Sequence, residues 1–526
     1  MTECLSIKKA SEWATAYLRR KVTTSNIAYL VQYGQIPKVY ENGSTQIKKA
    51  DLVAYYERVG SARELKWRDQ LGCDLNWTLS FVEYKESETT KHVHRLHPYK
   101  GKFIPQLVAY FLDTHTDSFK REVFFRRGDT VLDPFCGSGT TLVQANELGI
   151  HALGIDISAF NALISNVKVE AYDWADVRKT AREITSGFID FLSTRRTMAF
   201  ENKLLSALKD FNQRYFPAPE YRLKVRRKQI DERVYAMERE AEFLPLYNGL
   251  VKEYGIALTQ KGSERFLDKW FIREIRADID FVWEAIKKVQ NEKTRQILSV
   301  VLSRTIRSCR ATRHSDLGTL LEPQFTPYYC KKHGKICKPL FSILNWWNRY
   351  VADTVKRLVQ FDKLRTPTSQ ICLTGDSRAI DLVSELEAKN PAFAIRIKNK
   401  KIDGIFSSPP YVGLIDYHEQ HAYSYDLFGF KRRDDLEIGP LYKGQGIEAR
   451  KRYVQGVADV LNHSKKYLKR DYDVFLIAND KYGLYPTIAQ SAGMRIVNQY
   501  KRPVLNRVEK DRNAYAEIVF HLKEMH

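Results

Sequence analysis

Apolar residues return every three or four positions in the first segments of the chain, which is the spacing of one helix face. SIKKASEWATAYLR predicts an amphipathic helix of this kind. Thr24 or Ser25 then caps a second helix, which is expected to end at Gly34. A third helix, DLVAYYERV, has Asp51 in its first turn, where a negative charge suits the positive end of the helix dipole. The first part of the chain is therefore predicted to be a group of short helices.

Two short strands separate the second and third helices. QIPKVY and STQIK are joined by Asn42 and Gly43, a dipeptide typical of hairpin turns. Helix, turn, helix, small wing and helix over residues 5–58 resemble the winged helix-turn-helix domains of excisionase and MerR-type DNA-binding proteins. A small helical docking domain is the alternative. The resemblance places on the recognition helix the residues Ser25, Asn26, Tyr29 and Gln32.

The pattern changes to buried strands around a helix between residues 130 and 158. Val131 and Leu132 end one apolar strand, DPFCGSG forms a loop that contains glycine, and TTLVQANELG continues as a helix. A second apolar strand ends in Asp156, so the stretch predicts a βαβ unit with an acid beyond the loop. Glycines let the backbone approach a ligand, and the acid can accept hydrogen bonds from a ribose diol.

The glycine loop departs from the pattern of dinucleotide-binding proteins. Only Gly137 and Gly139 are present where that class has three glycines, and Asp133 precedes them. A carboxylate at this strand end disfavours a pyrophosphate. It suits a positively charged ligand with an amino group, such as S-adenosylmethionine.

A second loop, in GIFSSPPYVG, begins after another short apolar segment. Pro409 and Pro410 end the strand before them, because neither has an N–H for the ladder and the first forces its predecessor into an extended conformation. The sequence therefore predicts a rigid, extended loop with exposed carbonyls and Tyr411 at its end, at which a ligand docks.

Composition adds a class of partner and a compartment. The 526 residues predict two to four domains, and the 85 Lys and Arg against 63 Asp and Glu give a net charge of +22. This excess favours a polyanion, either nucleic acid or an acidic membrane surface. We expect no membrane-spanning segment and no signal peptide, because no apolar run is long enough. The seven cysteines form no regular framework, which favours a reducing cytoplasm.

Three soft metal ligands lie close together in CKKHGKIC: Cys330, His333 and Cys337. No fourth ligand is nearby in the sequence, and the spacing matches no standard zinc site. The sequence therefore predicts no metal.

The two loops together resemble those of a known family. DPFCGSGTT with SSPPY resembles the amino-group DNA methyltransferases, which methylate N4 of cytosine or N6 of adenine. HPYKGKFIPQL and LTGDSR resemble motifs that enclose the cofactor there, and YDVFLIANDKYG and NAYAEIVFHLK resemble later core strands. The resemblance covers residues 92–165 and 369–524. It implies a seven-stranded, mostly parallel α/β sheet, similar to a Rossmann sheet, with a final antiparallel hairpin.

The resemblance also implies S-adenosyl-L-methionine as the cofactor and double-stranded DNA as the partner. The residues that it places at the cofactor are His97, Tyr99, Lys102, Phe103, Asp133, Pro134, Phe135, Gly137, Ser138, Gly139, Thr140, Asp156, Ile157, Asp376 and Ser377.

The Ser-Pro-Pro-Tyr loop has a chemical role under this resemblance. An exocyclic amine is a poor nucleophile, and acceptors that hold its hydrogens stabilise charge as the methyl arrives. The Ser408 hydroxyl and the Pro409 carbonyl are such acceptors, and Tyr411 can stack on a base that has left the duplex. The catalytic residues implied are Ser408, Pro409, Pro410 and Tyr411.

The residue before Pro-Pro-Tyr indicates the target base. In this family Asp or Asn goes mostly with N6 of adenine, whereas Ser, as here at Ser408, goes mostly with N4 of cytosine. We therefore expect cytosine-N4, with adenine-N6 as the second choice. Methylation at cytosine C5 is disfavoured, since the cysteine nucleophile of that family typically follows a proline and none here does.

A helical, charge-rich insertion over residues 166–368 separates the two loops, although the resemblance would place it after LTGDSR rather than before. Within it, arginines recur at every third position of SRTIRSCRATRH, which predicts one arginine-lined helix face that follows a DNA backbone. A solvated face is the alternative. The arginines are Arg304, Arg307, Arg310 and Arg313.

The predicted function is site-specific DNA methylation in restriction–modification or phage DNA protection, with a restriction endonuclease encoded separately. Two alternatives are an RNA base-amine methyltransferase and a DNA-binding regulator without activity. The winged module favours DNA, because A-form RNA hides the major groove that such a module reads. The intact loops speak against a decayed enzyme. The predicted layout is a winged module over 1–60, a linker over 61–91, a first core part over 92–165, the insertion over 166–368 and a second core part over 369–526.

Overall fold

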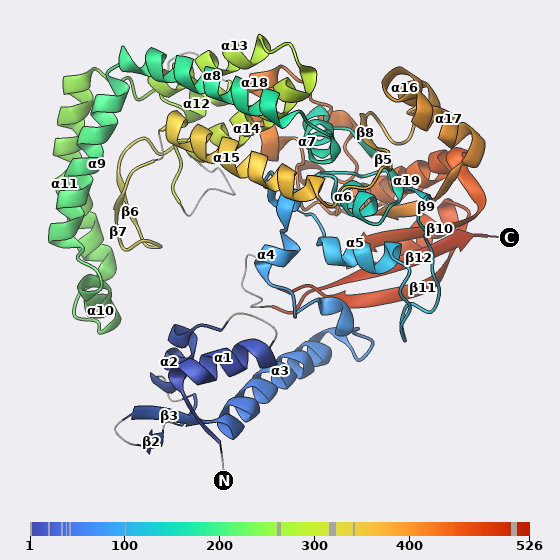
Figure 1. Ribbon diagram of the computed structural model, residues 1–526, viewed down its shortest axis with the longest axis horizontal. Coiled ribbons are helices and arrows are strands. Elements are labelled where there is room, and N and C mark those ends of the chain that lie inside the picture. The colour runs from blue at the N-terminus through green and yellow to red at the C-terminus, as the bar shows by residue number, and fades with distance from the viewer. Residues whose placement is uncertain are drawn as a thin grey trace.

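The computed structural model shows a sheet flanked by helices, a helical arm that projects from it and a small module at the N-terminus (Figure 1). Within the part of the chain that is described, no helix is long and apolar enough to cross a membrane. The structure describes residues 3–18, 22–32, 35–37, 39–41, 44–99, 101–259, 265–314, 322–339, 342–505 and 513–525.

A sheet of seven strands in the order β11-β12-β10-β9-β4-β5-β8 forms the centre of the fold. All neighbours from β10 to β8 run parallel, and β12 runs antiparallel to both β10 and β11. The expected α/β fold with a mostly parallel seven-stranded sheet is therefore confirmed. The strands are β4 Thr130–Asp133, β5 His151–Asp156, β8 Gln370–Thr374, β9 Ile402–Ser407, β10 Leu468–Ala478, β11 Met494–Pro503 and β12 Ala516–Glu524.

Strand β4 lies at the point where the strand order reverses. The chain continues from β4 to β5 and β8 on one side, while β9 and β10 lie on the other. The carboxyl ends of β4 and β9 therefore open beside each other, and this switch point is where parallel sheets bind ligands. The register brings Leu132 opposite Ile405, so the loops that follow both strands start at nearly the same height.

Successive residues of the central strands face opposite sides of the sheet and pack into two separate cores. Val131 belongs to one core and Leu132 to the other. Because both faces are covered, these strands are nearly continuously apolar. The first core includes α5 Pro105–Leu112, α6 Thr140–Glu147 and α7 Ala159–Val169, and the second includes α16 Leu382–Lys389, α17 Pro391–Lys400, α19 Ile447–Ser464 and α20 Tyr485–Ser491.

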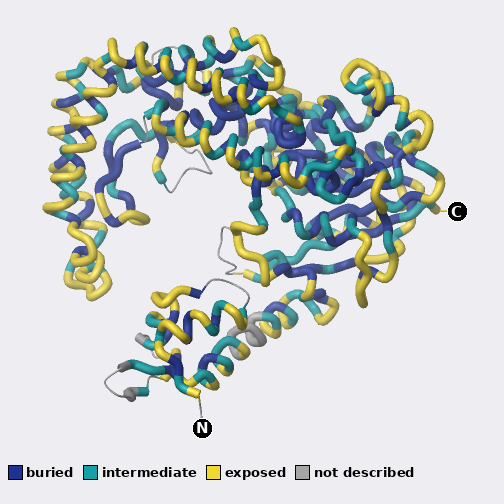
Figure 2. Tube along the Cα trace, viewed as in Figure 1, coloured by how far each residue is buried: buried dark blue, intermediate teal, exposed yellow. Residues whose placement is uncertain are grey.

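Between α7 and β8, the regular elements of the described residues are helices and one small hairpin. Helices α9 and α11 lie side by side and form the projecting arm, where exposed and buried positions alternate along the tube (Figures 1 and 2). Phe211 of α9 and Phe243 of α11 join them with ring centroids 5.0 Å apart. The elements are α8 Trp174–Ser193, α9 Thr197–Tyr215, α10 Glu220–Arg226, α11 Glu232–Tyr254, α12 Phe266–Trp270, α13 Arg273–Lys287, α14 Glu292–Cys309, β6 Tyr328–Cys330, β7 Lys335–Cys337 and α15 Ile343–Asp362.

The N-terminal module has a small core of its own around Ala10, Ile27 and Ile47. It contains the expected helices and strands and one strand more, β1, which pairs with β3 so that the sheet has the order β1-β3-β2. The predicted stop at Gly34 and the turn at Asn42 and Gly43 lie outside the described residues. The elements are β1 Cys4–Ser6, α1 Ile7–Tyr17, α2 Thr24–Gln32, β2 Val39–Glu41, β3 Ser44–Lys48 and α3 Lys49–Leu71.

The stretch predicted as a linker, residues 61–91, is folded against the sheet. Helix α3 continues to Leu71, and the short helix α4 (Glu86–Thr89) lies further along. The N–H of Asn76 donates to the carbonyl of Lys501 on β11 at 2.7 Å, and the Arg502 Nε donates to the carbonyl of Leu79 at 3.0 Å. These contacts attach the stretch to the edge strand, so the description as a linker is wrong.

The arginine stripe is not the exposed face that its spacing predicts. Arg304 is 6% exposed, and its guanidinium contacts Asp353 of α15 at 2.5 Å and lies over the ring of Tyr350. Arg310 is also buried, and helix α14 ends at Cys309, before Arg313. Because α14 is buried on nearly all sides, Arg304 pairs inside the protein and Arg307 is only half-exposed, so the four arginines do not line one exposed surface.

We expect Arg304→Ala to lower the free energy of unfolding by about 1.5–3 kcal/mol, because it removes the buried hydrogen bonds of the guanidinium to Asp353 and Thr354, although Asp353 keeps Arg357 as a partner. Urea denaturation followed by tryptophan fluorescence measures this. The control, Arg233→Ala, removes an exposed arginine on α11 and should change stability by less than about 0.5 kcal/mol. Equal stability of the two variants would contradict the structural role of Arg304.

Candidate active site

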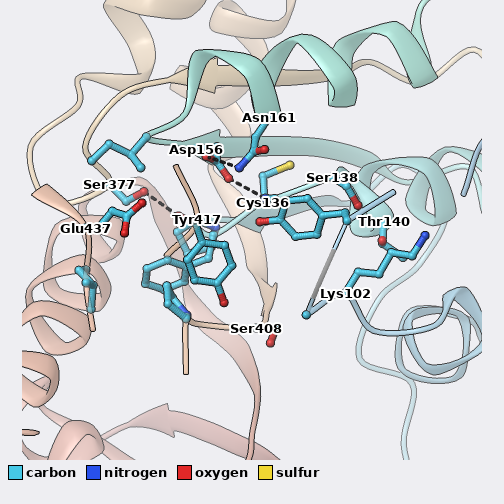
Figure 3. A pocket seen from close by; sticks show the side chains of 18 of the residues that line it. Lys102, Cys136, Ser138, Thr140, Asp156, Asn161, Ser377, Ser408, Tyr417 and Glu437 are labelled. Atoms are coloured by element: carbon cyan, nitrogen blue, oxygen red, sulfur yellow. Dashed lines mark hydrogen bonds between the residues drawn. The ribbon is translucent and has the colours of Figure 1, made fainter. Parts of the chain in front are cut away.

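A cavity opens at the carboxyl ends of β4, β5, β8 and β9, which is where the fold predicts a ligand. Its empty space is about 850 Å³, including the part open to solvent. Figure 3 shows Asp156 and Ser408 on opposite sides of the ring of Tyr417. The lining residues are Tyr99, Gly101, Lys102, Phe103, Pro134, Phe135, Cys136, Gly137, Ser138, Thr140, Asp156, Ile157, Asn161, Gly375, Asp376, Ser377, Ser408, Pro410, Tyr417, Leu436, Glu437 and Ile438.

Gly137 gives the glycine loop its shape. Its φ is +52°, in the left-handed region, and a Cβ at this position would lie 2.9–3.1 Å from atoms of the Tyr99 ring. The Gly137 N–H donates to the Asp156 carboxylate at 2.7 Å. Only a residue without a side chain satisfies both constraints, so the loop backbone is exposed to the cavity between Tyr99 and Asp156.

Two buried acids line the cavity, Asp156 and Glu437. Asp156 accepts hydrogen bonds from the backbone of Gly137 and Ser158 and from the Asn161 amide, and Glu437 accepts from the backbone of His418. Burial raises the pKa of each carboxyl to about 7, against these hydrogen bonds. A cationic ligand would stabilise their charged forms.

Asp133 connects the two loops that the sequence analysis singled out. It is 1% exposed and accepts the hydroxyl hydrogen of Ser407, the last residue of β9, at 2.5 Å. Burial raises its pKa to about 6, and this hydrogen bond opposes the increase. The Ser377 hydroxyl makes a similar link from the β8 loop, because it donates to the Pro134 carbonyl at 2.6 Å. These bonds fix the glycine loop, the β8 loop and the Ser-Pro-Pro-Tyr loop relative to one another.

Ser408 lies in the cavity wall, and its hydroxyl donates to the carbonyl of Ile477 on β10 at 3.1 Å. The hydroxyl hydrogen is therefore directed at the Ile477 carbonyl, and the oxygen lone pairs can accept a hydrogen bond from a ligand in the cavity. Pro410 also lines the cavity, whereas Pro409 is buried and is not among the lining residues. Tyr411 does not line the cavity: its ring packs on the second core and its hydroxyl donates to Glu517 at 2.7 Å.

Two expected cofactor residues, besides Asp133, lie behind the cavity rather than in its wall. His97 is fully buried and its Nε2 bonds the hydroxyl of Ser303 on α14 at 3.0 Å. Gly139 starts α6 with φ +74°, and a Cβ there would meet Ser165 of α7. These residues position the loop and the segment before it.

Lys102 and Asp376 line the cavity but have partners in the protein. The Lys102 ammonium donates to the His94 carbonyl at 2.5 Å, and burial lowers its pKa to about 8. Burial alone would raise the pKa of Asp376, but the paired guanidinium of Arg378 holds it below the ordinary value. Asp376 therefore stays ionised at neutral pH.

The segment between Tyr411 and α19 supplies cavity residues that the sequence analysis missed. Tyr417, Leu436, Glu437 and Ile438 come from it, and Tyr417 stacks on Tyr99 with ring centroids 6.3 Å apart. The segment contains only short helices, of which α18 (Ala422–Phe428) is the longest. No periodic pattern or motif marks Glu437, so it could not be identified from the sequence. Tyr417 and Asn161 follow the two recognised motifs closely.

The residues predicted to read DNA in the N-terminal module lie on α2, away from this cavity. Ser25 and Asn26 are exposed, and Tyr29 is 56% exposed. The Asn26 side chain accepts hydrogen bonds from the backbone and hydroxyl of Thr23, at 2.9 and 2.8 Å, so it caps the start of the helix. The side chain of Gln32 lies outside the described part of the chain.

The sheet and the cavity define a protein of the methyltransferase class, and comparisons with known proteins specify the family. Residues 13–166 match the family model of N6/N4 methyltransferases, described as DNA methylase. The Type II methyltransferase M.MjaII of Methanocaldococcus jannaschii is 42% identical over 527 residues, which cover 98% of this chain and 96% of that protein. The chain therefore belongs to the N4/N6 amino-methyltransferase family, among its Type II DNA methyltransferases.

More distant relatives match a smaller part of the chain, and the solved structures that match it superpose poorly on it. The Type II methyltransferase M.MvaI of Kocuria varians is 31% identical over 100 residues, or 19% of this chain and 21% of that protein. An rRNA methyltransferase from Streptomyces viridochromogenes, aviRa, covers 84% of this chain and 94% of its own, with 10% identity and a TM-score of 0.29. That overlap is too loose to support an inference.

We expect Gly137→Ala to lower the free energy of unfolding by about 1–2 kcal/mol from the left-handed backbone alone, with the contact to Tyr99 adding to it. Urea denaturation measures the change. Gly249→Ala is the matched control, because a Cβ in that part of α11 meets no atom within 4 Å. It should raise stability by about 0.5–1 kcal/mol through helix propensity. A Gly137→Ala protein as stable as the wild type would contradict this account of the loop.

Proposed function

We propose that this methyltransferase transfers a methyl group from S-adenosyl-L-methionine to N4 of cytosine in DNA. The observation that carries the proposal is the orientation of Ser408: its hydroxyl hydrogen is held by the Ile477 carbonyl, so its oxygen faces the cavity as an acceptor. An enzyme that methylates an amine needs an acceptor of this kind beside the methyl donor.

The chemistry of the cavity suits the cofactor. S-adenosylmethionine, when bound, supplies an electrophilic methyl group on a positively charged sulfur. Asp156 and Glu437 are buried acids whose charged forms a cation would stabilise. Phe103, Phe135 and Ile157 supply apolar walls of the kind that an adenine ring requires. Residues from the glycine loop, the β8 loop and the 412–446 segment would therefore hold the cofactor together.

The chain's own groups can prepare the target amine. A lone pair of the Ser408 oxygen and the Pro409 carbonyl would accept the two hydrogens of the exocyclic amine. This draws the nitrogen out of conjugation with the ring and directs its lone pair at the methyl group. The target base has to leave the duplex to reach this position. Tyr411, tied to Glu517, would hold the end of the loop rather than enter the cavity.

The short acceptor favours cytosine over adenine. Serine reaches less far than asparagine or aspartate, so the amine must come closer to the loop, and the smaller pyrimidine ring can sit deeper in a pocket. Ser407 supplies no alternative acceptor, because its hydroxyl is already bound to Asp133. Adenine-N6 is the second candidate, since the same acceptor can hold its amine.

The net charge of +22 and the N-terminal module are consistent with double-stranded DNA as the substrate. We propose that methylation protects the DNA against a restriction endonuclease encoded separately.

We expect Ser408→Ala to retain cofactor and DNA binding and to lose about 10²–10³-fold in the rate of methyl transfer, because the lost interaction is made mainly in the transition state. Mass spectrometry of nucleosides from methylated DNA identifies the product and its rate of formation. The control, Ser384→Ala, removes an exposed hydroxyl on α16 and should leave the rate unchanged. N4-methylcytosine supports the proposal, N6-methyladenine alone overturns the choice of base, and methylation of neither amine overturns both.

We expect the affinity for S-adenosylmethionine to rise with pH between about 6 and 8 and then to level off. Below pH 7 the carboxyls of Asp156 and Glu437 are protonated in the free protein, and a cation must expel their protons. Each carboxyl can contribute up to about tenfold in affinity per pH unit there. Titration calorimetry measures the profile. Glu437→Gln keeps an oxygen for the His418 N–H and should flatten it. A profile without pH dependence in the wild type would contradict a charged role for these acids.

A further inference from the structure

The structure adds a fourth side chain to the three soft ligands of the segment CKKHGKIC. Strands β6 and β7 form an antiparallel hairpin with His333 in its turn. Cys330 lies at the end of the hairpin next to the turn, and Cys337 lies at the open end, opposite Tyr328. His314, which lies beyond the end of α14, packs against His333 with ring centroids 4.6 Å apart. One ligand atom from each of the four residues lies within 4.8 Å of every other.

These separations are close to those of a tetrahedral zinc site. With Zn–S near 2.3 Å and Zn–N near 2.0–2.1 Å, the ligand atoms of such a site lie about 3.3–3.8 Å apart. The His333 Nδ1 is already 3.4 Å from the Cys337 sulfur. A shift of about one ångström by the remaining side chains would bring all four onto one ion.

The surroundings orient the ligands as the outer contacts of metal sites do. The Tyr328 hydroxyl bonds the His314 Nδ1 at 2.7 Å and accepts the His314 backbone N–H, which leaves Nε2 as the ring nitrogen for a metal. In the turn, the backbone N–H groups of His333 and Gly334 both donate to the Cys330 carbonyl, at 3.0 and 2.7 Å. These two hydrogen bonds reverse the chain direction and keep His333 on the same side as the cysteines, with its Nδ1 near the Cys337 sulfur.

One face of the hairpin packs on the helical arm, where Ile336 is buried in the first core and the Tyr329 hydroxyl donates to Glu232 at 2.8 Å. The hairpin's own buried cluster consists of Tyr328, Cys330 and Cys337, and two-stranded hairpins are marginal in water. Both cysteines are free thiols. The hairpin is attached to the arm by Asn212 of α9, whose amide bonds both backbone groups of Ile336 at 2.9 Å. A metal ion would fasten this hairpin to the chain segment that leaves α14.

We propose that His314, Cys330, His333 and Cys337 bind one structural zinc ion in the insertion. Two sulfurs and two imidazole nitrogens in a tetrahedral arrangement select zinc among the common divalent metals. Four protein ligands fill its coordination sphere, so the ion has no position for substrate and acts on the fold rather than on methyl transfer. The sequence prediction of no metal rested on the missing fourth ligand, which His314 supplies from a separate segment.

The test is the metal content of the full-length protein, purified under reducing conditions without chelator and measured by mass spectrometry of the elements. We expect about one zinc per chain in the wild type and in Cys73→Ser, which removes an exposed cysteine outside the cluster. Cys330→Ser and Cys337→Ser should lose the ion. Replacement by cobalt should give the visible bands of a tetrahedral ion and thiolate-to-metal charge-transfer absorption.

A second variant covers the case in which the serine variants do not fold. His333→Cys should keep the metal and strengthen the charge-transfer absorption of the cobalt form, because a third thiolate joins the site. A wild-type protein with neither zinc nor cobalt bands would overturn the proposal, and so would Cys330→Ser with full zinc content. A disulfide between Cys330 and Cys337 in the purified protein would also overturn it.

Discussion

The hydrogen bond from Ser407 to the buried carboxylate of Asp133 joins the two strand ends on which the active site depends. Asp133 ends β4 and begins the glycine loop, while Ser407 ends β9 and precedes the acceptor Ser408. Because the strands are parallel neighbours, this one short contact sets the position of the glycine loop relative to the Ser-Pro-Pro-Tyr loop, the two loops that in our proposal hold the methyl donor and the target amine. Chemistry that needs two groups within a few tenths of an ångström of their reacting positions depends on such a fixed distance.

Motifs confined to consecutive residues were predictable from the sequence. DPFCGSG and SSPPY each follow one strand, and the glycines and prolines act through their own backbone, so local rules identify them. The sheet followed from the same motifs through the family resemblance. Strands β4 and β5 were predicted directly from the pattern of the βαβ unit.

Features that depend on distant partners were not predictable. The spacing of Arg304 and Arg307 is the same for a helix face in water as for one in a core, and the burial of Arg304 depends on Asp353, which lies on another helix. Glu437 reaches the cavity because its segment folds back, with the Gly413 N–H bonded to the Gly439 carbonyl at 2.9 Å. His314 and Cys330 meet only through the tertiary fold. In each case the deciding contact joins segments that are far apart in the sequence, and neither segment has a pattern that predicts the contact.

The attachment of residues 72–81 to β11 has a consequence for the solubility of the protein. An edge strand presents unpaired backbone groups that can recruit a strand from another molecule. β11 is ten residues long, and the contacts of Asn76 and Leu79 with it cover part of that edge. Residues 72–81 thus leave fewer backbone groups of β11 open to pairing with a strand of another molecule.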